Sequence, residues 1–106
     1  MKTSITFRHM KATPAIKDFI MERLARLDRV GRGQKEAHVI LSVDKAQHEA
    51  EVIVTLKGLH AQAKSSTFDM YASIDEAIDK VEQTLRRHKS KKVKERNHSP
   101  RSVASL

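Results

Sequence analysis

The chain has 106 residues, a formal net charge of +8 and no cysteine. This length supports one domain with a modest core, and the missing cysteine excludes disulfides, thiolate chemistry and cysteine-ligated zinc. No secretory signal is visible and no apolar run approaches the ~18 residues that a membrane span needs, so we expect a soluble, cytoplasmic protein.

The first third of the chain predicts a strand followed by a helix. Apolar and polar residues alternate over residues 3–8, which is typical of a short strand with one covered face. Thr13 and Pro14 then form a helix start, because Thr caps free N–H groups and Pro suits the first helical position. This helix is predicted to run from Pro14 to about Arg29 and to stop near Gly31. Its apolar face consists of Ile16, Phe19, Ile20, Leu24 and Leu27.

Three further strands are predicted over residues 37–43, 49–57 and 60–66. The second of these places one large apolar side chain, Ile53, on its outer face. The third is weaker, and its inward residues are small, which favours either a close helix or a frayed edge strand. The predicted inward residues are Val39, Leu41, Val43, Ala50, Val52, Val54, Leu56, Ala61 and Ala63.

A long amphipathic helix is predicted over residues 69–92. Its apolar face carries Ile74, Ile78, Val81 and Leu85. The order β-α-β-β-β-α predicts an α+β domain, with a four-stranded, mostly antiparallel sheet and two helices packed on one face. This architecture resembles double-stranded RNA-binding domains at the level of fold. We assign residues 1–95 to the domain and residues 96–106 to a basic tail that is predicted to be disordered.

A second row of side chains on the long helix is basic. Lys80, Arg87, Lys91 and Lys94 project within about 60° of one another, away from the apolar face. Cations one turn apart match a phosphate backbone, although a solvated helix face has the same pattern. An acidic protein surface or an anionic membrane is the weaker alternative partner.

The charges are unevenly distributed along the chain. Residues 1–35 carry nine cations and three anions, and residues 83–106 carry eight cations and one anion. Residues 36–82 between them are acidic, with four cations and nine anions. If the two ends meet in space, they make a polarised molecule whose natural partner is a polyanion. The acidic residues of the long helix are interpreted as opposing the positive end of its dipole. They are Asp75, Glu76, Asp79 and Glu82.

No enzyme chemistry is indicated by the residue pattern. Six histidines lie far apart, without the spacing of metal sites, so we expect no metal, no cofactor and no catalysis. The few aromatic residues argue against stacking platforms on the sheet, so the helices are expected to carry any nucleic-acid contact. Arg23, Arg26 and Arg29 recur every three residues, and could border one continuous groove with the basic row if the helices lie side by side. For Arg23 the alternative is an alkyl stem on the core edge with its head in water.

Three segments of the chain resemble the ribosome hibernation promoting factor and ribosome-associated inhibitor family. They are residues 10–27, residues 38–42 and residues 69–92, with TPAI in the first and DMYxxID in the last. The resemblance covers residues 1 to about 93. It implies a factor that enters the small ribosomal subunit between head and body, where it blocks the mRNA channel and the A and P tRNA sites.

The resemblance also assigns roles to individual residues. Basic side chains of both helices contact ribosomal RNA in the family, and two further candidates here are Tyr71 and Arg29. By position the RNA-binding role falls on Arg23, Arg26, Lys80, Arg86, Arg87, Lys89, Lys91, Lys92 and Lys94.

The expected partners follow from the resemblance of this chain to the short members of the family. They are the small subunit and its RNA, whole ribosomes and a separate ribosome modulation factor, with no membrane and a monomeric free protein. The alternatives are a general double-stranded RNA-binding module and a basic protein-interaction adaptor.

Overall fold

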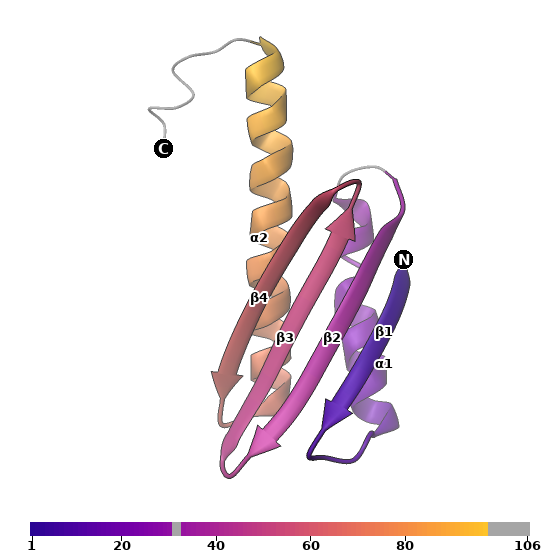
Figure 1. Cartoon of the computed structure of the whole chain (residues 1–106), viewed down its shortest axis with the longest axis vertical. Helices are drawn as coiled ribbons and strands as arrows, with labels where there is room; N and C mark the ends of the chain where they lie inside the picture. The colour runs from indigo at the N-terminus through magenta and orange to yellow at the C-terminus, as the bar shows by residue number, and fades with distance from the viewer. Residues whose placement is uncertain (31–32, 98–106) are drawn as a thin grey trace.

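The computed structural model describes the backbone of residues 1–30 and 33–97, and the side chains of this part as far as residue 88. Here the chain forms four strands, two α-helices and one short 3₁₀ turn, in the predicted order (Figure 1). In chain order these are β1 (Lys2–Arg8), α1 (Pro14–Leu24), η1 (Leu27–Arg29), β2 (Lys35–Asp44), β3 (Gln47–Leu56), β4 (Leu59–Thr67) and α2 (Met70–Asn97). The tail beyond Asn97 lies outside the described residues, so its predicted disorder stays a prediction.

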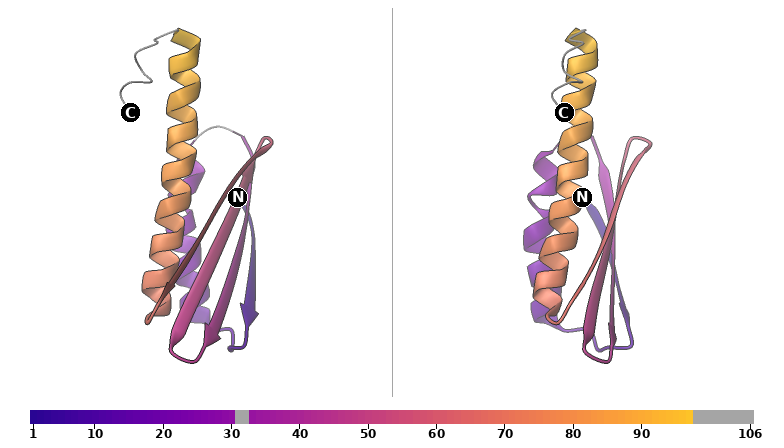
Figure 2. Two further views of the ribbon diagram at one scale, coloured as in Figure 1. Left: turned by 60° about the vertical axis from the view of Figure 1, so that its left-hand side comes forward. Right: turned by 90° about the vertical axis from the view of Figure 1, so that its left-hand side faces the viewer.

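The strands form one mixed sheet in the order β1-β2-β3-β4. β1 is parallel to β2, and α1 lies in the connection between them, whereas β2–β3 and β3–β4 are antiparallel pairs joined by short turns. The register places Val39 opposite both Ile5 and Val52. Both helices lie on the same face of the sheet (Figure 2), which confirms the predicted α+β architecture.

The helix α1 begins where the sequence predicts and ends earlier. Thr13 is its N-cap, because the Oγ1 atom accepts a hydrogen bond from the Ile16 backbone N–H at 3.1 Å. The prediction that the helix continues to Arg29 is wrong, since hydrogen bonds from residue i+3 to residue i replace the α-helical ones from the Arg26 N–H onward. This tighter turn keeps Leu27 fully buried and leads the chain into the extended, buried Val30.

The core lies between the sheet and the two helices. Val39, Leu41, Val52 and Val54 of the central strands are completely buried, as predicted from their alternation. From the helices, the residues buried to the same degree include Ile20, Ile74, Ile78 and Val81. Phe19, Val43, Leu56 and Ala63 are only half-buried, because they lie toward the rim of the layer.

The small residues of β4 accommodate α2. Ala61 and Ser65 are buried beneath the helix, and α2 packs on β4 and β3. β4 pairs with β3 along its whole length, from Thr67 opposite His48 to Leu59 opposite Leu56. The close-approach interpretation of this strand is therefore confirmed and the frayed one is wrong.

The start of α2 depends on polar contacts. Asp69 caps the helix by accepting the Ala72 N–H at 3.3 Å, and the buried Ser73 hydroxyl donates to the His48 carbonyl at 2.6 Å. The first turn itself holds no acidic residue. The dipole interpretation of Asp75 and the later carboxylates is therefore wrong, because the dipole acts mainly within the first turn.

We predict that Ile78→Ala lowers the free energy of unfolding by about 2–5 kcal/mol, because the side chain is fully buried between α2 and the sheet. Urea denaturation followed by circular dichroism measures this loss. The matched control is Ile53→Ala on the half-buried outer face of the sheet, where we expect a clearly smaller loss. Equal losses at the two positions would contradict the placement of the core.

Candidate nucleic-acid interface

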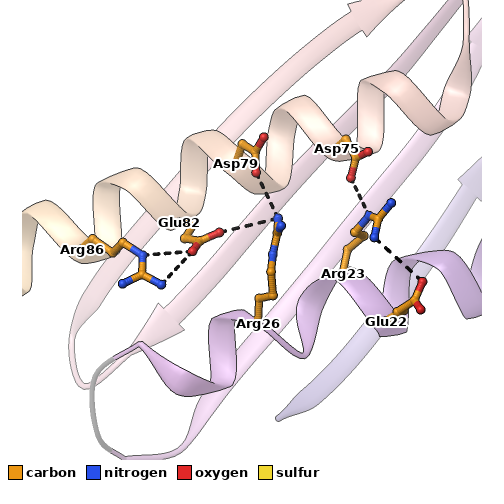
Figure 3. A network of polar contacts seen from close by, with 7 residues as sticks. All are labelled: Glu22, Arg23, Arg26, Asp75, Asp79, Glu82 and Arg86. Atoms are coloured by element: carbon orange, nitrogen blue, oxygen red, sulfur yellow. Dashed lines mark hydrogen bonds and ion pairs between the residues drawn. The ribbon is translucent and has the colours of Figure 1, made fainter.

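Ion pairs connect the two helices along their facing sides (Figure 3). The Arg23 Nε atom lies 2.8 Å from the Asp75 Oδ1 atom. The Arg26 Nη2 atom lies 3.0 Å from the Asp79 Oδ1 atom and 3.6 Å from the Glu82 Oε1 atom. Arg23 in the last turn of α1 and Arg26 just after it thus meet residues spaced four and three apart on α2, the spacings that keep side chains on one helix face.

Arg86 extends these contacts along α2, where its Nε atom lies 2.9 Å from the Glu82 Oε2 atom. We call this set the interhelical ladder. Its members are Arg23, Arg26, Asp75, Asp79, Glu82 and Arg86.

Aromatic rings flank one end of the interhelical ladder. The Phe19 and Tyr71 rings meet edge to face, with centroids 4.8 Å apart. The Arg23 guanidinium carbon lies 4.5 Å from the centroid of the Phe19 ring. Arg23 is thus held by a ring and a carboxylate, and its side chain is 35% exposed. The guanidinium group of Arg23 is therefore fixed between the two helices. The alternative in which this group only extends into water did not include these contacts.

The basic row lies on the other flank of α2. Lys80 is exposed, and its Nζ atom donates to the Lys64 carbonyl of β4 at 3.5 Å. Arg87 is exposed and forms no ion pair with the described residues. Lys80 thus reaches toward the sheet edge, while Asp79 faces Arg26 in the turn after α1.

The expected single groove between the two sets of cations is therefore not formed. Arg23 and Arg26 face the acidic flank of α2, and the basic row of Lys80 and Arg87 lies beyond that flank. The helix α2 thus separates two cationic surfaces. Carboxylates neutralise part of the charge of Arg23 and Arg26, whereas Lys80 and Arg87 have no carboxylate partner among the described residues.

The remaining predicted RNA-binding residues occupy different places. Arg29 is exposed in η1 and Arg86 is exposed in α2. The backbone of α2 continues through the positions of the last four predicted cations, but their side chains lie outside the described residues. These four are Lys89, Lys91, Lys92 and Lys94.

Phe68 was missed by the sequence reasoning, which considered Phe7 and Phe19 as core residues and Tyr71 as a possible RNA contact. It lies between β4 and α2 and is 78% exposed. A signal was present in the alternation of β4, where Ala61 and Ser65 point inward. Phe68 follows in the outward phase of that alternation.

The described residues contain no group of three or more His, Asp or Glu side chains that could hold a metal ion. A hollow of about 540 Å³ lies near the chain start, but its charged groups contact one another. The N-terminal amine lies 3.6 Å from the Asp28 carboxylate, and the Lys35 Nζ atom donates to the Asp28 carbonyl at 3.2 Å.

Neither of the described helices is long and apolar enough to cross a membrane. The exposed cations of α2, Lys80 and Arg87, are suited to electrostatic recognition of an anionic partner.

The chain is similar to several characterised bacterial proteins. It is 32% identical over 91 residues to a ribosome hibernation promoting factor of Pseudomonas putida, with 86% of this chain and 89% of that protein covered. It is 31% identical over 91 residues to the protein of the same name from Escherichia coli K12, with coverages of 86% and 96%.

Solved structures agree with these similarities. The N-terminal domain of Thermus thermophilus Protein Y superposes with a TM-score of 0.79 at 35% identity, over 83% of this chain and 99% of that domain. A ribosomal subunit interface protein of Coxiella burnetii shares the fold, with a TM-score of 0.75 at 23% identity, over 85% of this chain and 99% of that one. A family model described as Sigma 54 modulation protein / S30EA ribosomal protein matches residues 3–93. The chain therefore belongs to this family, as its sequence motifs predicted.

Proposed function

We propose that this chain is a ribosome hibernation factor, a non-enzymatic inhibitor of translation in the cytoplasm. It binds ribosomal RNA in the decoding region of the small subunit and occupies the mRNA channel and the A and P tRNA sites. The observation that carries the proposal is the exposed cationic flank of α2, where Lys80 and Arg87 have no carboxylate partner among the described residues. The names of the relatives support the same function.

The cationic flank suits an RNA backbone in length and charge. Lys80 and Arg87 are two turns apart, or about 10 Å along the helix axis. The sequence continues this row with Lys91 and Lys94, while the backbone of α2 runs to Asn97. A straight row of cations contacts successive phosphates and releases their counterions, which is the main source of sequence-independent affinity.

The arginines of the interhelical ladder have a second role in this proposal. Only the Nη2 atom of Arg26 contacts carboxylates, so its Nε and Nη1 atoms have no carboxylate partner in the described part. The Arg23 Nε atom lies 2.8 Å from the Asp75 Oδ1 atom, and its Nη1 atom lies 3.9 Å from the Glu22 Oε1 atom. The side chains of Arg23 and Arg26 remain 35% and 46% exposed, which supports RNA contact by both, although the carboxylates of α2 neutralise part of their charge.

We predict that binding to isolated small subunits weakens steeply with salt. Neutralising about six phosphates implies a slope on the order of −4 to −5 in a plot of log affinity against log salt. Co-sedimentation over a salt series measures this slope, with large subunits and naked duplex RNA as controls. Prior occupation of the channel by mRNA and tRNA should block binding. Equal affinity for naked duplex would instead indicate a general double-stranded RNA-binding module, and a flat salt dependence would contradict the mechanism.

We predict that the double variant Lys80→Glu, Arg87→Glu abolishes most small-subunit binding. Its free energy of unfolding should stay within about 0.5 kcal/mol of the parent, because both side chains are exposed. The matched control is Lys2→Glu, Lys57→Glu, which changes the net charge equally at exposed positions of β1 and the β3–β4 turn. Equal losses of binding in the two variants would show that net charge alone decides affinity.

We predict different effects on stability for the two ladder arginines. Arg23→Ala removes a carboxylate contact and a cation–π contact, which together contribute about 1–2 kcal/mol. Arg26→Ala removes only ion pairs that are about half exposed, which contribute less than about 1 kcal/mol. Denaturant titration compares the stability of the two variants. A third variant, Arg23→Lys, keeps the charge without the planar group, and tests whether charge alone recovers more of the binding than of the stability lost in Arg23→Ala. A larger loss of stability from Arg26→Ala would contradict this ranking.

A further inference from the structure

Phe68 is the most exposed of the large apolar side chains in the described part of the chain. It is 78% exposed, compared with 49% for Met21 and 39% for Tyr71. It is also absent from the half-buried apolar residues that pack against the core. An aromatic ring in this state contributes nothing to the apolar core, although transfer of such a ring out of water is strongly favourable.

The backbone on both sides of Phe68 is fixed by hydrogen bonds. The Thr67 hydroxyl contacts the Asp69 carbonyl at 2.7 Å, the Asp69 N–H at 3.0 Å and the Ser73 hydroxyl at 2.8 Å. The Asp69 carboxylate caps α2 through the Ala72 N–H. The exposed ring is therefore presented from a rigid turn, which lowers the entropic cost of binding through it.

The usual structural role for an apolar residue at this position is missing here. Phe68 precedes the N-cap of α2, where an apolar residue often packs against the fourth residue of the helix in a hydrophobic staple. That fourth residue is Ser73, which is buried and bonded to the His48 carbonyl. The ring consequently has no staple partner.

Two loops at the same end of the molecule as Phe68 carry exposed cations. The β1–α1 loop with Lys11 and the β2–β3 turn with Lys45 lie at the same end of the molecule as the start of α2 (Figure 1). Lys11 and Lys45 are exposed and form no ion pair with the described residues. Tyr71 lies about one helical turn further on, where its ring is perpendicular to that of Phe19.

We infer that Phe68 is a stacking site for an unpaired RNA base, whose neighbouring phosphates are attracted by the cations at this end of the molecule. An exposed ring combined with a cationic surface is the usual composition of a site for single-stranded nucleic acid. The net charge of +8 favours RNA over an acidic or apolar protein partner. The inference rests on the proposed function, and adds a second contact about 28 Å along α2 from Arg87.

The first test compares Phe68→Ala with the parent in small-subunit binding over a salt series. Loss of one stacked base lowers affinity roughly 5- to 100-fold, while the slope against log salt stays unchanged because stacking releases no counterions. The control variant is Met21→Ala, which removes an exposed apolar side chain from α1 and should bind as the parent does. Unchanged affinity of Phe68→Ala would overturn the inference and leave the proposed function intact.

The second test uses Phe68→Trp, because the chain has no tryptophan and the new residue is then the single indole reporter. Titration with single-stranded oligouridylate and with small subunits should quench its fluorescence, as a stacked base does. A blue shift without quenching on small subunits would indicate an apolar protein pocket and overturn the inference. If the parent fails to bind small subunits, the proposed function fails, and the oligouridylate titration still decides whether Phe68 stacks on a base.

Discussion

The structure depends on one constraint, which is that both helices must cover the same face of a four-stranded sheet. The apolar residues of β2 and β3 project onto that face, and Ile20 and Ile78 are buried against it. Burial of apolar area is the main favourable term in folding, at about 25 cal/mol per Å². Because the two helices share one face, they lie side by side and their polar flanks meet. The pairing of Arg23 with Asp75 is a consequence of this arrangement.

Three consecutive residues of α2 show how one helix serves three purposes. Ile78 enters the core, Asp79 pairs with Arg26 in the turn after α1, and Lys80 reaches the carbonyl of Lys64 in β4. The helical rotation of about 100° per residue sends these side chains in different directions. The acidic flank toward α1 neutralises part of the charge of the first basic segment. The opposite flank keeps its charge available for a polyanion.

The two ends of α2 present different chemistry to a partner. Phe68 and Tyr71 lie at its start, and exposed cations occur on loops at the same end of the molecule. Arg86 and Arg87 lie further along, where the sequence becomes strongly basic. An aromatic ring binds a base by stacking, whereas a row of cations binds the phosphate backbone. The two ends of α2 are therefore suited to different parts of one RNA. The length of α2 sets the distance between them.

The helices and strands could be predicted from the amino-acid sequence, because their signals are local. Thr13 with Pro14 marks the start of α1, and the apolar spacing around Ile78 marks the buried face of α2. Periodicity also identified the basic row of Lys80 and Arg87, since side-chain direction within a helix follows from spacing alone. The packed structure was needed to show which carboxylate Arg26 meets, where α1 ends and that Phe68 has no partner at the start of α2. These features depend on contacts between segments far apart in the chain, and no local pattern specifies the distance or angle at which two helices pack.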